Sequence, residues 1–213
     1  MRRLSILLAD DHPMVSAGFQ KLLEPEYEVV GIVEDGRAVL KAAAELKPDM
    51  AILDVSMPLL NGLDTGRRLK ALMPQIKLIY LTMNSDLDFA KEALEIGASA
   101  YLLKNSLPSE LLRAIRDVVK GRSYITPLIT RALNEAFIRD PREVSRPKHL
   151  TSRQREILQM LAEGQSMKEI ANVLNITHRT VRFHKAQIMQ ELRIHSHMEL
   201  LQYAIKHGMV STI

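Results

Sequence analysis

The chain has 213 residues, of which 46% are hydrophobic and 25% are charged, a globular composition with room for two domains. Its apolar runs, such as residues 50–53, are far shorter than the roughly 20 residues that span a bilayer. The absence of cysteine excludes disulfides, cysteine-based zinc sites and thiol catalysis. The N-terminus lacks the apolar core of a signal peptide, so we expect a cytoplasmic protein without membrane contact.

The net charge of +4 is unevenly distributed along the chain. Residues 145–213 contain ten Lys or Arg, five Asp or Glu and six of the seven His, whereas residues 1–144 are close to neutral. A basic region attracts polyanions, so this asymmetry indicates a polyanionic partner for the C-terminal third.

Short apolar runs alternate with helical patterns over the first 120 or so residues. The predicted strands are Leu4–Ala9, Glu28–Val33, Met50–Asp54, Lys77–Leu81 and Ala100–Leu103. Continuous apolar strands are typical of a sheet covered on both faces, and the repeated strand-helix order favours parallel strands with right-handed crossovers. We therefore predict an α/β domain with a doubly wound, five-stranded parallel sheet over residues 1–121.

The rest of the chain has helical patterns only. Residues 122–147 contain three prolines and a charged stretch, which predicts a linker with a short helix near Leu128–Phe137. Residues 151–154 and 166–169 have the form of capping boxes, Thr177 is a suitable cap for a third helix, and a fourth helix covers His197–His207. We predict a small all-α, four-helix domain over residues 148–213.

Polar residues gather at the carboxyl ends of the predicted strands, where doubly wound folds place their chemistry. Asp10 and Asp11 follow the first strand, Asp54 ends the third, and Thr82 and Lys104 follow the fourth and fifth. Three converging carboxylates repel one another, so a bound cation is expected, and oxygen-only ligands favour Mg²⁺. A carboxylate beside such a metal can attack phosphorus, with Lys104 and Thr82 stabilising the phosphoryl oxygens.

Any one of these residues alone is more often a loop or capping residue than a functional one. Together, residues 8–13, 54–58, 81–82 and 101–104 resemble the receiver domain of bacterial response regulators, which has a flavodoxin-like fold. The resemblance implies that Asp54 accepts a phosphoryl group from a partner histidine kinase. It also implies that Asp10, Asp11, Asp54 and the main-chain carbonyl of Ser56 hold Mg²⁺, and that Thr82 and Tyr101 form the switch pair.

A phosphatase of the haloacid-dehalogenase kind also uses a strand-end Asp nucleophile with Mg²⁺. It requires a second Asp two positions later as general acid, and Ser56 at that position cannot protonate a leaving group at neutral pH. We therefore expect a protein that is not a turnover enzyme. A regulator of the same shape that is never phosphorylated is the closest alternative.

Residues 150–158, 170–174 and 180–184 resemble the LuxR-type helix-turn-helix, and the match covers about residues 148–210. Joined to a receiver domain, this is the NarL/FixJ class of response regulator, which implies a transcription regulator that binds double-stranded DNA as a homodimer. Two departures from the family pattern, Glu191 and Arg193, leave the backbone contacts open.

The helix after Thr177 has an apolar face and a basic, amide-bearing face. Val181, Ile188 and Leu192 share the apolar face, which predicts core packing. The opposite face suits the major groove, where Arg and Gln read base edges. A solvated surface is the competing interpretation, and Phe183 has a second one, packing against the preceding helix. The predicted DNA contacts are Thr177, His178, Arg179, Thr180, Arg182, Phe183, Lys185, Ala186, Gln187 and Gln190.

The last predicted helix has apolar residues on two sides. One stripe contains Met198, Leu201 and Ile205, and the other contains Leu200, Tyr203 and Ala204. A small domain cannot bury both, so one stripe is expected to face a partner. The family resemblance implies a dimer through this helix, and we predict Leu200, Tyr203 and Ala204 as its surface. Core packing is the competing interpretation of this stripe.

Overall fold

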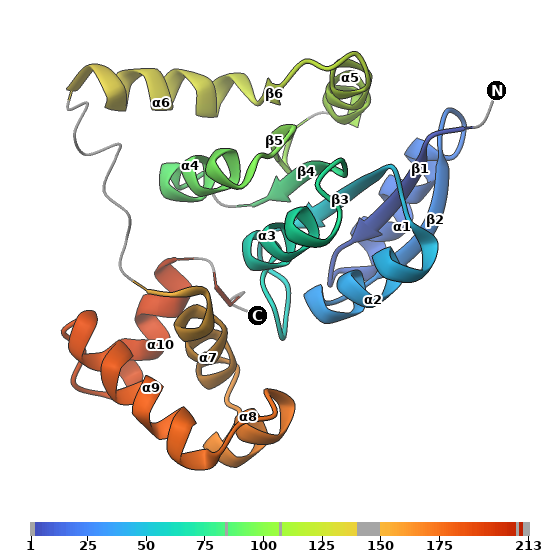
Figure 1. Cartoon of the computed structure of the whole chain (residues 1–213). Coiled ribbons are helices and arrows are strands. Elements are labelled where there is room, and N and C mark those ends of the chain that lie inside the picture. The colour runs from blue at the N-terminus through green and yellow to red at the C-terminus, as the bar shows by residue number, and fades with distance from the viewer. Residues whose placement is uncertain (1–2, 84, 107, 140–149, 208, 211–213) are drawn as a thin grey trace.

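A computed structural model describes residues 3–83, 85–106, 108–139, 150–207 and 209–210 (Figure 1). Its N-terminal part is a parallel sheet between two layers of helices, and its C-terminal part is a group of helices. The later part of the predicted linker and the boundary at residue 148 lie outside the described residues.

The sheet confirms the predicted doubly wound topology and adds one strand. Its spatial order is β2-β1-β3-β4-β5-β6, with every neighbouring pair parallel. The sixth strand has only two residues, too few to produce a sequence pattern, and it lies in the segment predicted as a linker. The strands are β1 Ser5–Ala9, β2 Glu28–Val33, β3 Met50–Asp54, β4 Lys77–Thr82, β5 Ala100–Leu103 and β6 Tyr124–Ile125.

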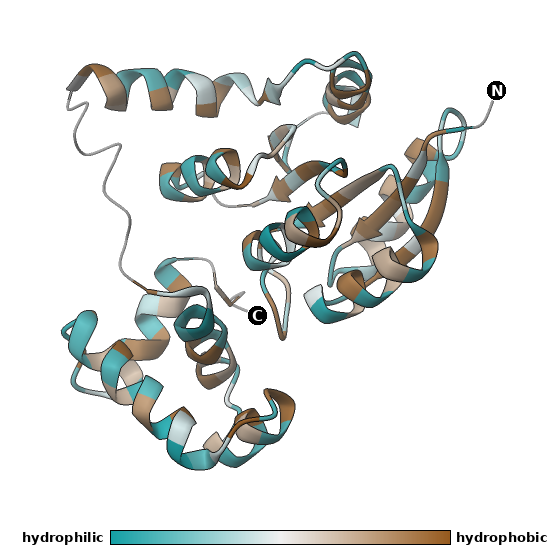
Figure 2. Cartoon of the chain, viewed as in Figure 1, coloured by the Kyte–Doolittle hydropathy of each residue, from teal (hydrophilic) through white to brown (hydrophobic). Residues whose placement is uncertain are grey.

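Helices cover both faces of the sheet because the strands are apolar on both sides, as Figure 2 shows. Helices α1 and α5 pack on one face, and α2, α3 and α4 pack on the other. Helix α6 packs beside α4 through Ile129 and Leu133, so part of the predicted linker contributes to this core. The helices are α1 Pro13–Leu23, α2 Gly36–Leu46, α3 Gly62–Leu72, α4 Leu87–Ile96, α5 Pro108–Val119 and α6 Pro127–Arg139.

The C-terminal helices have a core of their own. They are α7 Ser152–Ala162, α8 Met167–Val173, α9 His178–Glu191 and α10 His197–Lys206. Both predicted capping boxes are present, at Thr151 and Ser166, and the Thr177 side chain accepts a hydrogen bond from the Thr180 N–H. Val181 and Ile188 are fully buried and Leu192 packs against the core, as their spacing predicted.

Helix α10 corrects the predicted dimer surface. Leu200 and Ala204 are fully buried in the C-terminal core, and Tyr203 is half-buried against it. The opposite stripe is the open one, since Met198 is 62% exposed and Ile205 38% exposed. The physical reason is the packing of α10 on α7, which encloses one apolar stripe of α10 and leaves the other to solvent.

None of the helices in the described part of the chain combines the length and the apolar character that crossing a membrane requires.

Candidate functional site

A buried cluster of charged side chains lies at the carboxyl ends of the central strands. Asp10 follows β1, Asp54 ends β3, and these two strands are neighbours in the sheet. The Lys104 ammonium lies 2.7 Å from Asp54 Oδ2 and 2.8 Å from Asp10 Oδ2. All three side chains are at most 6% exposed. The structure therefore brings together three residues that the sequence separates by more than 40 positions.

The environment shifts the protonation equilibria of this cluster. Burial raises the pKa of Asp54, and attraction to the Lys104 ammonium opposes this effect without cancelling it. For Lys104, burial lowers the pKa, but the negative charge of Asp54, the hydrogen bond to Asp54 and the ion pair with Asp10 outweigh burial, so its pKa is raised. Lys104 is thus held as a cation between two acidic groups.

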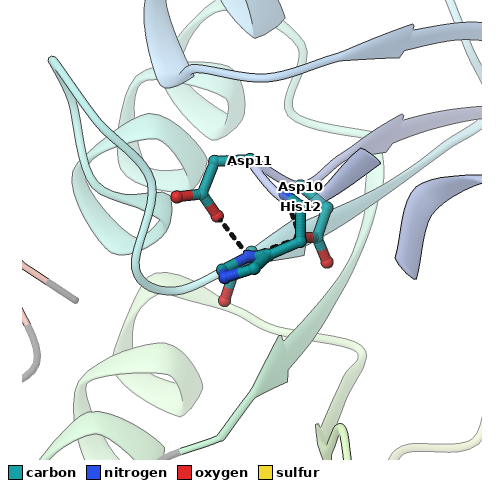
Figure 3. Close-up of side chains that lie close together, drawn as sticks. Asp10, Asp11 and His12 are labelled. Carbon is teal, nitrogen blue, oxygen red and sulfur yellow. Dashed lines mark hydrogen bonds and ion pairs between the residues drawn. The ribbon is translucent and has the colours of Figure 1, made fainter. Parts of the chain in front are cut away.

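One further carboxylate and an imidazole complete the cluster. Asp11 and His12 follow Asp10 directly, and one ligand atom from each of Asp10, Asp11, His12 and Asp54 lies within 4.8 Å of the others. Figure 3 shows the imidazole turned toward the two neighbouring carboxylates. Three carboxylates face a single ammonium, so the cluster carries an excess of negative charge that a divalent cation would balance. The residues fit a metal-binding acidic cluster of the kind typical of phosphoacceptor sites.

The loop between β3 and α3 is shaped around Asp54. The Ser56 N–H donates to Asp54 Oδ1 over 3.2 Å, which orients the carboxylate. A Cβ at Gly62 would lie 2.0 Å from the Asp54 carbonyl oxygen, so only glycine permits α3 to begin this close to the strand. Between them, Leu59 has a φ of 63°, a left-handed conformation that costs energy for a residue with a branched side chain.

Thr82 and Tyr101, the predicted switch pair, lie on the neighbouring strands β4 and β5 and are both buried. Burial raises the pKa of Tyr101, and the negative charge of Asp86 adds to this effect. The Tyr101 ring therefore occupies an interior position in this structure.

The predicted DNA-contacting residues form an outer face of α9. Phe183 is 58% exposed, so its packing against the preceding helix, the alternative considered from the sequence, is wrong. This face of α9 is open to solvent in a structure that includes both the receiver and the C-terminal helices. Its exposed members are Thr177, His178, Arg179, Arg182, Phe183, Ala186 and Gln190, and its half-buried members are Thr180, Lys185 and Gln187.

Helix α7 contacts the loop that follows Asp54. Gln159 Nε2 donates to the Met57 carbonyl oxygen at 2.5 Å, and Gln159 Oε1 accepts from the Asn61 N–H at 3.0 Å. Glu163 Oε1 accepts from the Leu59 N–H at 3.2 Å. These side chains therefore hold the backbone of the loop, including the residue with the left-handed conformation.

Two buried carboxylates anchor the same helix to the receiver. Asp64 on α3 pairs with Arg155 at 3.0 Å, and Glu156 on α7 pairs with Arg37 at 2.9 Å and Arg68 at 3.0 Å. Asp64 and Glu156 are both fully buried, so separating the domains exposes charges that are paired in this arrangement.

The sequence analysis did not predict the contact between α7 and the receiver, and it gave His12 no role in the site. The only available sequence features were polar residues at helical spacing on α7 and a His next to two aspartates. A polar helix face usually indicates solvent, and only the meeting of two domains buries this one.

A buried Asp–Lys site on a doubly wound sheet, followed by a helix-turn-helix with an open basic face, defines a DNA-binding signalling regulator. Residues 6–116 match the response regulator receiver domain, and residues 148–204 match the luxR family of bacterial regulatory proteins. The chain belongs to the two-component response regulators with a LuxR-type DNA-binding domain, which are transcription regulators and not turnover enzymes.

Two relatives match nearly the whole chain, and a third matches about two thirds of it. The oxygen regulatory protein NreC of Staphylococcus aureus RF122 is 37% identical over 211 residues, which are 95% of this chain and 97% of NreC. RcsB of Salmonella enterica bound to a promoter in the presence of a phosphomimetic has a TM-score of 0.67 and 28% identity, over 96% of this chain and all of that chain. A LuxR-family response regulator of Aurantimonas has a TM-score of 0.62 and 32% identity, over 64% of this chain and 99% of that chain.

Proposed function

We propose that Asp54 accepts a phosphoryl group from a sensor histidine kinase and that this event controls operator binding by a homodimer. The observation that carries the proposal is the Lys104 ammonium between Asp54 and Asp10 in a buried cluster of charged side chains. We assign residues 1–121 to the receiver and 148–213 to the DNA-binding domain, joined by 122–147. The cytosol is the expected site of action, because the DNA partner is there.

Each residue of the acidic cluster has its own role in the proposed phosphoryl transfer. An Asp54 carboxylate oxygen bonds to phosphorus as the bond between phosphorus and the donor imidazole breaks. Lys104 and the Thr82 hydroxyl then pair with the phosphoryl oxygens, and Tyr101 follows Thr82 as the second member of the switch. Asp10, Asp11, Asp54 and the Ser56 main-chain carbonyl would hold Mg²⁺, which supplies positive charge to the phosphoryl oxygens.

The DNA-binding part of the proposal is supported by the open face of α9. Arg182, Phe183 and Gln187 are placed to approach base edges, and Thr177 and Thr180 at the helix N-terminus are placed to approach phosphates. RcsB dimers have been solved bound to DNA. The exposed stripe of α10, with Met198 and Ile205, replaces Leu200 and Ala204 as the proposed dimer surface.

The contact between α7 and the receiver provides a route from Asp54 to the DNA-binding domain. A phosphoryl group on Asp54 carries about −1.5 to −2 charges in place of the single charge of the carboxylate, so negative charge increases next to the loop that Gln159 and Glu163 hold. We infer that the loop then changes conformation and releases α7. The α9 face is open before release, so release changes where the domain can move and not whether α9 is exposed.

Incubation with acetyl phosphate and Mg²⁺ tests the acceptor. One phosphoryl mass should appear on the intact chain and should disappear in Asp54→Asn. An unchanged mass of the folded wild-type chain, or labelling that survives this substitution, would show that Asp54 is not the acceptor.

A further inference from the structure

The His12 side chain does not cap the helix that begins beside it. His12 is the N-cap residue of α1, yet its side chain makes no capping hydrogen bond to the helix. Its backbone N–H donates to Asp10 Oδ1 at 3.0 Å, so this turn is held by the His12 main chain and the Asp10 carboxylate and does not require the imidazole. The imidazole instead lies over the acidic cluster, with Nδ1 2.8 Å from Asp11 Oδ1 and 3.3 Å from Asp10 Oδ1 (Figure 3).

The separations among the four groups suit a single ion. One ligand atom each from Asp10, Asp11, His12 and Asp54 lies within 4.8 Å of the others. An octahedral ion with bonds of about 2.1 Å places neighbouring ligands about 3 Å apart and opposite ligands about 4.2 Å apart. Small side-chain movements therefore suffice to bring one nitrogen and three oxygens onto one ion.

The donor set selects the kind of ion. Carboxylate, carbonyl and water ligands suit Mg²⁺, whereas an imidazole nitrogen adds affinity for first-row transition dications, most for Ni²⁺ and Zn²⁺ and least for Mn²⁺. His12 is 54% exposed on its outer side, so the ring can turn toward an ion without displacing core residues.

We propose that His12 is a metal ligand of the acidic cluster around Asp54. This receiver consequently binds first-row transition dications through one nitrogen and three oxygens, in addition to binding Mg²⁺. The inference rests on the proposed function, because it uses the same carboxylate cluster. Mg²⁺ binding should depend on the carboxylates and hardly on His12, whereas binding of Mn²⁺ and Zn²⁺ should depend on both.

The first test is pulsed electron paramagnetic resonance of the full-length, untagged chain with one equivalent of Mn²⁺. Modulation by an imidazole nitrogen is expected in the wild type and should disappear in His12→Asn. His195→Asn, which changes an exposed His at the other end of the chain, should retain it. Modulation that survives His12→Asn, or that is absent from wild-type protein with bound Mn²⁺, would overturn the inference.

Calorimetric titrations separate this inference from the proposed function. His12→Asn should weaken Zn²⁺ and Mn²⁺ binding by about tenfold or more, since loss of even an outer-sphere partner costs roughly 10- to 100-fold, and should change Mg²⁺ binding less than about twofold. Equal affinities of His12→Asn and wild type for all three ions would remove His12 from the site and leave the Mg²⁺ proposal intact. Failure of folded wild type to bind any of the ions would overturn both.

Discussion

Asp54 is held in a site that disfavours its charged form. Its carboxylate is 3% exposed, and its pKa is raised above the ordinary value of 3.8 mainly by burial. A carboxyl group whose pKa is higher in the folded state contributes stability at low pH and loses it as the pH rises through that pKa. At neutral pH without metal, the ionised Asp54 therefore opposes folding.

Replacing this carboxylate by an amide should stabilise the metal-free protein. We expect Asp54→Asn to raise the free energy of unfolding by roughly 0.5–2 kcal/mol at pH 7 in EDTA, with the gain vanishing near pH 4. Urea unfolding followed by circular dichroism measures it, with the exposed Glu45→Gln as control. A variant less stable than wild type at pH 7 would show that the Lys104 attraction outweighs burial.

Phe183 tests whether the open face of α9 reads bases. Its ring is 58% exposed and contacts His184 edge to face at a centroid distance of 5.9 Å. Phe183→Ala should leave the melting temperature nearly unchanged and should weaken cognate DNA binding by roughly 1–3 kcal/mol, with relaxed preference at one base pair. Fluorescence anisotropy on a set of single-base operator variants measures this. A loss equal for every sequence would contradict base reading.

Among the elements, α10 shows that sequence periodicity alone does not predict which side of a helix is buried. Helical spacing correctly predicted two apolar stripes, but it carries no information about which stripe meets α7. The caps at Thr151, Ser166 and Thr177 were predictable because capping depends on residues three positions apart. The position of the acidic cluster was also predictable, because a parallel sheet places the carboxyl ends of its strands at one edge.

Substitutions on the two stripes of α10 should therefore have different consequences. Met198→Glu on the open stripe should weaken binding to a two-half-site operator by about tenfold or more and leave half-site binding and the melting temperature nearly unchanged. Leu200→Ala on the buried stripe should cost roughly 2–5 kcal/mol of stability. Equal losses of Met198→Glu on half and full sites would exclude this stripe from the dimer.

At the scale of the whole molecule, the α7 contact joins the phosphoacceptor loop to the DNA-binding domain. No periodicity predicts it, because Gln159, Glu163 and their backbone partners lie about a hundred residues apart and meet only when the domains dock. If phosphorylation releases α7 as proposed, the coupling is reciprocal, and a substitution that releases α7 should also favour the loop conformation of the phosphorylated state.

Weakening the contact should therefore act on both domains. The double variant Gln159→Ala, Glu163→Ala should accept phosphate from acetyl phosphate several-fold faster, and its unphosphorylated form should bind DNA more tightly than wild type, by about 1–3 kcal/mol of coupling. Phosphorylation kinetics and anisotropy titrations measure the two effects. Glu45→Ala, which removes an exposed carboxylate from α2, is the control. Unchanged kinetics together with unchanged DNA affinity would remove this contact from the switch.

The most direct test of the central claim is genome-wide footprinting of the purified chain with and without acetyl phosphate, using wild type and Asp54→Asn in parallel. Phosphorylation should create or strengthen a defined set of paired half-sites in the wild type, and the donor should change nothing in Asp54→Asn. The same footprints in both proteins, independent of the donor, would contradict control of DNA binding by phosphorylation at Asp54.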